Sequence, residues 1–576
     1  MANYLSINYG GHDTSAALMI DGVLVAACEE ERYNLEKHTR AFPENAIADC
    51  LDIGGIRIDE VDEVSLCADT AFQIREAYLK PALLDDSRID FMIADIERIK
   101  LYRGVVDEVR GLLGYEGPMV QHRHHLCHLA STYYPSGFDE SLLLSLDGVG
   151  EIETGILATG RGGDIEILHD KTHSPDSLGL LYSALTFFLG WRHHYDEGII
   201  MGLACYGDAE NTVPGSDRSY IDVFREIVQE TGPYDYVVNR DWISYHRQRD
   251  TWVSELFHEM FGEKREYEDE LTQHHMDIAA GLQTRLEEVV LSQLEKARDE
   301  TKLTKLCIAG GVGLNCSMNG AIAASGLFEE LFVQPASGDS GTAVGGCYLS
   351  EKTHNPALVP AKWHDFYLGS RSTETEIEQA FTDAGVEFTK PDDLYELVAR
   401  QLEAGLIVGW FQGGSEFGPR ALGNRSILAR PYPAEMKDHI NARVKFREYF
   451  RPFAPAALLD HASDYFDIDQ HTPHMLIACQ AVEERAEEIA AVVHIDNSCR
   501  LQTVTADSNA KFHRLLSEFH SLTGCPVLMN TSFNVKGQPI VNTAEQAVAS
   551  FLSTNIDVLV VGDCYAEKAD EDKGQR

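Results

Sequence analysis

Two histidines four residues apart, His124 and His128, are the side chains of this chain best suited to binding a metal ion. In a helix, residues at this spacing project from the same face, one turn apart. An apolar run at 142–146 ends at Asp147, and the end of a buried strand can bring a carboxylate to the same point. Two imidazoles and a carboxylate suit a divalent metal such as iron or zinc. A histidine-rich surface turn is the alternative that the spacing leaves open.

Further strand ends carry groups that could approach a ligand. The apolar segment 306–309 runs into Gly310-Gly311-Val312-Gly313, and a glycine-rich turn before a helix is a common nucleotide cradle, although this short pattern has low specificity. Asp339 follows another strand and precedes the small-residue segment 342–349. It is either a second metal carboxylate or a helix N-cap, and its position by itself favours the cap.

Basic residues gather in the second half of this acidic chain, several of them within apolar or glycine-rich sequence: Arg420, Arg425, Arg430, Lys445, Arg447, Arg451 and Arg500. For any one of them a structural salt bridge is the simpler interpretation, because a buried charge needs a partner. As a group they suit phosphates, which the planar guanidinium matches. Segment 530–534 follows a predicted strand at 527–529 and would add amide and hydroxyl donors.

The elements that must position these groups alternate between strands and helices. The chain opens with strands at 4–9, 16–20 and 23–28, and Asp21-Gly22 between the last two is a strong hairpin signal. The same pattern of strands and glycine turns returns after Asp147, which indicates a duplicated, actin-like domain. Long helices are predicted at 90–113 and 275–300, a linker at 351–367, and a second αβ alternation beyond it. We therefore predict an α/β protein of two domains.

The composition is that of a globular and strongly acidic protein, with 576 residues and a formal charge of −44. This charge argues against nucleic-acid binding, and is also typical of proteins adapted to high salt. No apolar run is long enough to span a membrane and the start lacks a basic segment before an apolar core, so we expect a cytoplasmic protein without membrane association. The 12 cysteines include no CxxC pair, which argues against zinc ribbons and a disulfide framework.

Seven segments, in order along nearly the whole chain, resemble the O-carbamoyltransferase family, whose members include the NodU type and the tobramycin carbamoyltransferase. They are Gly11-His12-Asp13, Glu29-Glu30-Glu31-Arg32, His124-His125-Leu126-Cys127-His128, Leu146-Asp147-Gly148, Gly310-Gly311-Val312-Gly313-Leu314-Asn315, Phe417-Gly418-Pro419-Arg420-Ala421-Leu422-Gly423 and Asn530-Thr531-Ser532-Phe533-Asn534.

The resemblance implies an actin-like (ASKHA) domain at 1–355 and a YrdC-like domain at 366–576. The family makes carbamoyl-adenylate and pyrophosphate from carbamoyl phosphate and ATP in the YrdC-like domain. The actin-like domain then passes the carbamoyl group to a hydroxyl of a small molecule, often a sugar. Arginines and a metal would stabilise the negative charge that builds on oxygens in these steps. Neither the acceptor nor the oligomeric state follows from the sequence, which is compatible with a homo-oligomer.

The resemblance also implies a role for each matching residue. A divalent metal, with iron implied, would be bound by His124, His128, Asp147 and Asp339. The adenylate would be held by Gly310, Gly311, Gly313 and Asn315. Carbamoyl phosphate and Mg²⁺-ATP would be surrounded by Arg420, Lys445, Arg451, Arg500, Asn530 and Ser532.

His12, beside the first glycine turn, is the candidate general base, because a neutral imidazole suits proton abstraction near pH 7. The alternative is a turn residue that only binds the acceptor. One position departs from the family pattern: Ile199 stands where lysine is usual, which leaves the contacts of that loop open.

Three other functions are weighed against carbamoyl transfer. A metalloprotease needs a glutamate beside the first histidine, where His125 stands. An actin-like small-molecule kinase would also bind ATP, but it leaves the metal residues and the basic second domain unexplained. A non-enzymatic nucleotide sensor does not account for so many polar groups at strand ends. Carbamoyl transfer explains all of these features together.

Overall fold

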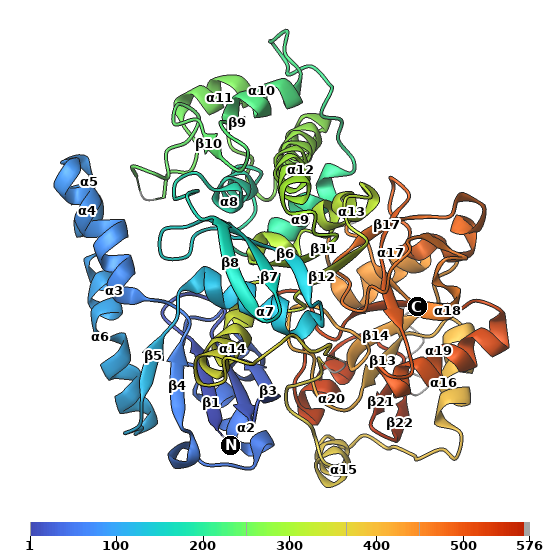
Figure 1. Cartoon of the computed structure of the whole chain (residues 1–576). Helices are drawn as coiled ribbons and strands as arrows, with labels where there is room; N and C mark the ends of the chain where they lie inside the picture. The colour runs from blue at the N-terminus through green and yellow to red at the C-terminus, as the bar shows by residue number, and fades with distance from the viewer. Residues whose placement is uncertain (1, 249, 364–365, 449, 569–576) are drawn as a thin grey trace. The chain divides into compact units, whose positions relative to one another are not determined.

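The chain forms two compact units in a computed structural model that describes residues 2–248, 250–363, 366–448 and 450–568. The first unit is Met1–Ala27 with Arg40–Trp363, and the second is Cys28–Thr39 with His364–Arg576 (Figure 1). The main division, after Trp363, falls in the predicted linker. The short segment Cys28–Thr39, however, packs with the second unit, which the sequence analysis did not predict.

Two five-stranded sheets build the first unit. One has the order β3-β2-β1-β4-β5 and the other β12-β11-β6-β7-β8. The strands of the first sheet are β1 (Asn3–Asn8), β2 (Ser15–Ile20), β3 (Val23–Glu29), β4 (Glu63–Leu66) and β5 (Met119–Gln121). Those of the second are β6 (Glu140–Leu146), β7 (Gly155–Arg161), β8 (Asp164–His169), β11 (Lys305–Ala309) and β12 (Glu330–Val333).

The two sheets repeat one topology, which confirms the duplicated, actin-like fold. β1 pairs antiparallel with β2 and parallel with β4. In the same way β6 pairs antiparallel with β7 and parallel with β11. The turns repeat as well: β2 and β3 are joined by Asp21-Gly22, and β7 and β8 by Gly162-Gly163, with positive φ at all four residues. Such two-residue turns match the twist of the strands they join.

Helices cover both sheets, and α7 (His124–Ser136) and α14 (Thr342–His354) pack against each other and against strands of the two sheets. The other helices of this unit are α2 (Glu44–Gly54), α3 (Thr70–Gln73), α4 (Lys80–Leu84), α5 (Ser87–Ala94), α6 (Ile96–Leu113), α8 (Leu178–Phe188), α9 (Glu197–Ala204), α10 (Tyr220–Ile227), α11 (Glu255–Phe261), α12 (Gln273–Thr301) and α13 (Cys316–Ala324). Three short 3₁₀ helices are η1 (Ile58–Glu60), η3 (Gly311–Leu314) and η4 (Asp339–Gly341), and η2 (Ile74–Leu79) is a π-helical segment between α3 and α4. The strand β9 (Val228–Glu230) pairs with β10 (Tyr236–Val238).

The prediction of one helix over 90–113 was wrong, because the structure has two, α5 and α6, separated at Asp95. The side chain of Asp95 is buried and accepts a hydrogen bond of 2.9 Å from the hydroxyl of Tyr78. The helix predicted at 275–300 is confirmed as α12.

A seven-stranded mixed sheet forms the centre of the second unit, which confirms a second α/β domain. Its order is β19 (Gln502–Val504), β15 (Ala454–Leu458), β20 (Val527–Ser532), β14 (Arg425–Ala429), β13 (Val408–Phe411), β21 (Val558–Val561) and β22 (Cys564–Glu567). A smaller sheet holds β16 (Phe466–Asp467), β17 (Ala478–Ala481) and β18 (Ser498–Arg500). The helices are α1 (Glu31–Asn34), α15 (Glu374–Asp383), α16 (Leu394–Glu403), α17 (Met436–Ile440), η5 (Asn441–Lys445), α18 (Leu459–Ala462), η6 (Glu483–Val492), α19 (Ala510–Thr523) and α20 (Ala544–Ser553).

Two further features agree with the composition. All 12 cysteines are free thiols, as the absence of paired cysteines in the sequence predicts. Within the part of the chain that the structure describes, no helix combines the length and apolar character needed to cross a membrane.

Candidate metal centre and anion site

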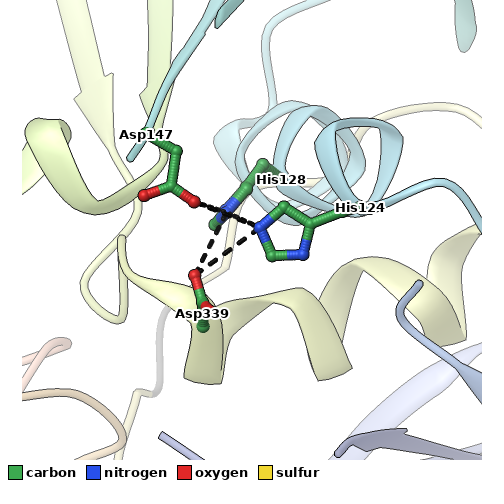
Figure 2. A group of neighbouring side chains, drawn as sticks. All are labelled: His124, His128, Asp147 and Asp339. Atoms are coloured by element: carbon green, nitrogen blue, oxygen red, sulfur yellow. Dashed lines mark hydrogen bonds and ion pairs between the residues drawn. The ribbon is translucent and has the colours of Figure 1, made fainter. Parts of the chain in front are cut away.

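Four side chains from three separate parts of the first unit converge at one point (Figure 2). His124 and His128 lie one turn apart on α7, Asp147 directly follows β6, and Asp339 opens η4. The nearest ligand atoms of the four residues all lie within 4.8 Å of one another. His128 is fully buried and His124 nearly so, which excludes the surface-turn alternative.

The separations of these atoms fit a single bound cation. The two Nε2 atoms of His124 and His128 are 3.0 Å apart. Asp147 Oδ2 lies 3.1 and 3.4 Å from them, and Asp339 Oδ1 lies 3.5 and 3.9 Å away. Four ligands placed tetrahedrally at bond lengths of about 2.0–2.1 Å would be about 3.4 Å apart. Two imidazoles with two carboxylates are also a donor set that divalent iron or zinc accepts.

The electrostatics of this cluster require positive charge at its centre. Burial alone would lower the pKa of His124, but the facing carboxylates of Asp339 and Asp147 raise it well above its usual value. Burial likewise opposes ionisation of Asp147, yet its hydrogen bonds to His124 and His128 hold the pKa of this carboxyl well below its usual range. A proton or a metal ion can meet this requirement.

The carboxylate of Asp147 is held in place by the backbone around it. Asp147 Oδ1 accepts hydrogen bonds from the amides of Gly148 and Gly311, at 2.8 and 3.2 Å, which leaves Oδ2 directed at the histidines. Asp339 makes no capping bond to η4, and α14 begins only after Gly341. The N-cap interpretation of Asp339 is therefore wrong, and its carboxylate faces His124 and His128 instead.

His12 lies beside the same cluster. Its Nδ1 is 2.8 Å from Asp13 Oδ2, and its Nε2 is 3.9 Å from Asp339 Oδ2. Although burial works in the opposite direction, Asp339 and Asp13 raise the pKa of His12 to about 10. The imidazole is thus protonated at neutral pH, whereas the sequence analysis expected a neutral one. Neutralising the carboxylate charges that face it would restore the neutral form.

His125, which occupies the position of a protease glutamate, has a structural role. Its Nδ1 lies 2.8 Å from Ser145 Oγ and its Nε2 lies 3.0 Å from the carbonyl oxygen of Glu153. Burial, together with His124 and His128, lowers its pKa to about 3. Both ring nitrogens are therefore engaged, and His125 cannot serve as a protease base.

The sequence analysis missed Glu151, a buried carboxylate that anchors the start of α7. Its Oε1 accepts hydrogen bonds from the amides of His124 and Asp69, at 2.9 and 2.8 Å. Its Oε2 lies 3.3 Å from Arg123, whose guanidinium stacks over the ring of Phe72. A carboxylate at this place stabilises the helix N-terminus and sets the orientation of His124. No local sequence signal marks it, because its partners come from two distant segments, the one at Asp69 and the start of α7.

The glycine-rich segment packs tightly against protein atoms. Gly310 has a φ of +91°, and a Cβ there would lie 2.1 Å from the carbonyl oxygen of Leu146. A Cβ at Gly313 would lie 2.3 Å from Ser337 Oγ. Asn315 caps α13 through the amide of Met318 and exchanges hydrogen bonds with Gln283. These contacts with protein atoms shape the turn beside Asp147. Contact of the same turn with an adenylate is a proposal. Ile199 is buried in α9.

In the second unit, Lys445 is a buried cation at the end of η5. Its Nζ donates to the carbonyl and hydroxyl oxygens of Ser532, and to the carbonyl and side-chain oxygens of Asn534. None of these partners is a carboxylate. Burial, together with Arg447, Lys37 and Arg451, lowers the pKa of Lys445 well below its usual value. A bound anion would compensate this concentration of positive charge.

Arg447, one of the basic residues that the sequence groups together, belongs to the same cluster, although the family resemblance gave it no specific role. Burial and the neighbouring Arg451 and Arg500 lower the pKa of Arg447 well below its usual value. Its guanidinium stacks over Phe453 and donates to Asn441 and to the carbonyl of Pro452. Arg451 lies 3.6 Å from Glu448. The structure thus brings Lys445, Arg447, Arg451 and Arg500 into one electrostatic group.

Other predicted residues of this unit have structural contacts. Asn530 and Ser532 lie inside β20, so the prediction that the strand ends at 529 was wrong. Asn530 is buried and donates to Gln502 and to the carbonyl of Ala421. Arg420 is half-buried in the loop between β13 and β14. Arg425 is fully buried, donates to four backbone carbonyls and stacks on Phe411, which excludes it as a phosphate ligand.

Comparison with known proteins decides the family. Residues 3–348 match the family described as Carbamoyltransferase N-terminus, and residues 399–568 match the Carbamoyltransferase C-terminus. The chain belongs to the carbamoyltransferase family. An uncharacterized protein of Synechocystis is 37% identical, over 97% of this chain and 96% of its own length. Nodulation protein NolNO of Sinorhizobium fredii is 36% identical, over 97% of this chain and 79% of its own.

This carbamoyltransferase is also compared with solved structures. HypF from T. kodakarensis is 16% identical and covers 62% of this chain and 49% of its own, at a TM-score of 0.32. A score this low carries no argument about function. Family membership makes the chain a transferase of carbamoyl groups. It identifies neither the acceptor nor the way in which the carbamoyl group is activated.

Proposed function

We propose that this carbamoyltransferase activates carbamoyl phosphate with ATP and then transfers the carbamoyl group to a hydroxyl of a small molecule. In the second unit, water would hydrolyse carbamoyl phosphate to carbamate and phosphate, and a carbamate oxygen would then attack the α-phosphorus of ATP to give carbamoyl-adenylate and pyrophosphate. Transfer would occur in the first unit and release AMP. One observation carries the proposal. The same chain holds a cluster of side chains that requires a bound cation, in the first unit, and another that requires a bound anion, in the second.

The second unit supplies groups suited to the activation step. Lys445, Arg451 and Arg500 would hold the phosphates of carbamoyl phosphate and Mg²⁺-ATP, with Arg447 as an additional cation. Negative charge moves onto pyrophosphate as the α-phosphorus is attacked, and preorganised cations stabilise that charge. The amide and hydroxyl groups of Asn530 and Ser532 mainly hold the surrounding strands and Lys445.

The first unit supplies groups suited to the transfer step. His124, His128, Asp147 and Asp339 would hold a divalent metal, which supplies Lewis-acid polarisation of an oxygen when bound. His12 would take the proton of the acceptor hydroxyl, since neutralisation of Asp339 and Asp147 lowers its pKa towards the neutral range. The glycine turn at 310–313 would lie against the adenylate, beside Asp147.

Isotope exchange tests the activation step directly. Metal-loaded protein, ATP and labelled pyrophosphate are incubated with and without carbamoyl phosphate. Label should enter ATP only when carbamoyl phosphate is present, because only a reversible adenylation links the two. Absence of exchange in protein that binds both nucleotide and carbamoyl phosphate would contradict the adenylate mechanism.

The same incubation separates carbamoyl transfer from an actin-like kinase. A kinase would produce ADP with a hydroxyl acceptor and would not need carbamoyl phosphate. Carbamoyl transfer would produce AMP and pyrophosphate, and the acceptor would gain the mass of a carbamoyl group. Mass spectrometry of a metabolite library after incubation with carbamoyl phosphate and ATP would then identify the acceptor.

A further inference from the structure

Three rings of the first unit gather beside His12 and have no part in the steps described so far. His194 lies in the loop between α8 and α9, and its ring centroid is 6.2 Å from that of His12, with an angle of 29° between the ring planes. Trp252 lies in the loop between β10 and α11. Its ring centroid is 4.4 Å from that of His193 and 5.4 Å from that of His194. All three side chains are half-buried, so they keep exposed surface next to the candidate base.

His194 is held in a conformation that few residues adopt. Its φ of +62° lies in the left-handed region, which is uncommon for residues other than glycine. Its amide donates a hydrogen bond of 2.5 Å to Glu197 Oε1, and the hydroxyl of Ser183 donates one of 2.5 Å to the same oxygen. Its ring nitrogen Nδ1 lies 3.4 Å from Ser183 Oγ. Backbone strain of this kind persists where the surrounding contacts fix it, and it is concentrated at functional sites.

These contacts decide which ring nitrogen of His194 carries the proton. The hydroxyl proton of Ser183 is directed at Glu197, so Ser183 Oγ is an acceptor towards Nδ1, and Nδ1 is the donor. Burial, followed by the nearby His193 and His12, lowers the pKa of His194 to about 3, so the ring is neutral. Its Nε2 therefore carries a lone pair, and no residue in the described part of the chain bonds to it. A ligand hydroxyl can donate to this atom.

Trp252 offers a flat apolar surface beside that lone pair. Its backbone is fixed, because its carbonyl oxygen accepts a hydrogen bond of 3.1 Å from the amide of Ser244. The carboxylates next to His194 are already engaged: Asp196 pairs with Arg192, and Glu197 is bound as described above. An indole, a neutral imidazole and engaged carboxylates suit an uncharged ring with hydroxyl groups, since such sites combine aromatic surface with a few polar atoms.

We propose that His194 and Trp252 bind the acceptor in the transfer site. His194 Nε2 accepts a hydrogen bond from a hydroxyl next to the one that His12 would deprotonate, and Trp252 packs on the ring that carries both. The acceptor is then an uncharged ring with adjacent hydroxyls, and not a polyamine. This inference rests on the proposed function, because His12 marks the acceptor position only if transfer occurs in the first unit.

Substitutions of His194 test the role of Nε2, with methyl α-glucopyranoside as the probe acceptor. Metal-loaded full chain is incubated with ATP, carbamoyl phosphate and the probe, and the carbamoylated product is measured by mass spectrometry. His194→Asn keeps a donor towards Ser183 and tolerates the left-handed backbone, but it has no atom at Nε2. It should raise the KM for the probe about three- to tenfold, as for one lost hydrogen bond. His194→Gln can place its amide oxygen near Nε2 and should recover most of this loss. A purely structural role predicts the opposite order of the two variants.

Substitutions of Trp252 test the packing surface. Trp252→Ala should raise the KM for the probe about tenfold, and Trp252→Phe should raise it much less. His173→Ala is the control, because His173 is exposed and bonds only to the carbonyl of Asp170 in the described structure. Quenching of tryptophan fluorescence by the probe should occur in wild type and disappear in Trp252→Phe, and this measurement needs no turnover.

Pyrophosphate exchange, measured on each preparation, separates the two levels of the argument. Absence of exchange in wild type would contradict the proposed function, and the fluorescence titration would still test the assignment of Trp252. Normal exchange without carbamoylation or quenching by the probe would overturn the acceptor class. So would equal use of the analogue with an ammonium group in place of one hydroxyl, at about pH 6, where its amine is charged. An unchanged KM in both His194→Asn and Trp252→Ala would overturn the assignment of the residues.

Discussion

The two charged clusters of this carbamoyltransferase have opposite requirements. In the first unit, carboxylates surround imidazoles and overcome the effect of burial, so that the pKa of His124 is raised. In the second unit, burial and neighbouring cations act together, so that the pKa of Lys445 is lowered. The first cluster is stabilised by an added cation and the second by an added anion. Each cluster would therefore reject the ligand that the other attracts.

This difference would let one chain carry out the two proposed steps without interference. The positive charges of Lys445 and Arg451 would repel a metal ion from the basic cluster. The negative charges of Asp147 and Asp339 would repel free phosphate from the metal centre. Variants that reduce both activities equally would contradict this division of roles, and variants that reduce only one activity would support it.

Replacing His128 should have the largest effect. His128→Ala removes a fully buried ligand atom, so bound metal should be lost and carbamoyl transfer should fall by at least about 10³-fold, while pyrophosphate exchange stays within about twofold of wild type. Metal content, exchange and product formation are measured on the same preparation. His122→Ala is the matched control, since His122 bonds to Ser350 and lies outside the cluster. Equal loss of exchange in His128→Ala would show that the two steps share one site.

Replacing Arg451 should have the reverse effect. Arg451→Ala removes a cation facing the proposed phosphates, so exchange should fall by about 10²–10³-fold, as for loss of one preorganised charge donor. Metal content should not change. Arg400→Ala serves as control, because Arg400 pairs with Glu396 on the outer face of α16. Unchanged exchange in Arg451→Ala would remove this residue from the site.

Glu151 should act on the metal indirectly. Glu151→Ala leaves the amide of His124 without its acceptor, and the metal affinity should weaken by about 10–100-fold, as for other residues that orient ligands. Glu151→Gln keeps an oxygen acceptor and should recover most of this affinity. Competition with a chelator measures both. Equal weakening in the two variants would mean that the carboxylate charge matters more than the hydrogen bond.

Proton uptake should accompany anion binding at the second cluster, and this is the smallest effect. Because the pKa of Lys445 is lowered, a bound phosphate should raise it towards its usual value. Binding should therefore take up a fraction of a proton near and above the lowered pKa, and affinity should fall as pH rises. Calorimetry of phosphate binding in buffers of different ionisation enthalpy measures this uptake. Lys445→Met should abolish it, and uptake that persists in this variant would assign it to another group.

Local patterns were sufficient to suggest three of the four residues of the candidate metal centre. The helical repeat placed His124 and His128 on one face, and an apolar strand ending in Asp147 brought the first carboxylate. The position of Asp339 depends on packing between segments more than 200 residues apart, and its local sequence looked more like a helix cap. The tertiary fold of the first unit brings η4 beside α7, and local sequence patterns do not predict such a contact.

Charge patterns in the second unit were informative as a group but did not separate individual roles. Arg425 and Arg451 both lie within apolar or glycine-rich sequence. In the structure, however, the guanidinium of Arg425 donates its hydrogen bonds to backbone carbonyls, whereas Arg451 belongs to the electrostatic group of Lys445. Glu151 was missed for a related reason. Its importance comes from the loops that surround it, and a lone glutamate after Gly148-Val149-Gly150 carries no signal of that kind.

The segment Cys28–Thr39 has a consequence for how the protein can be divided. The carboxylate of Glu29 accepts a hydrogen bond from the amide of Gly418. The buried Arg32 donates a hydrogen bond to the carbonyl oxygen of the same Gly418, which lies 386 residues after Arg32 in the sequence. A fragment beginning at 366 would lack both partners, and a fragment ending at 355 would expose a buried arginine. No single cut separates the two units, so during synthesis the segment Cys28–Thr39 must wait until the rest of its unit, from residue 364 onward, has been made. Two separate genes could not replace this one without first moving that segment.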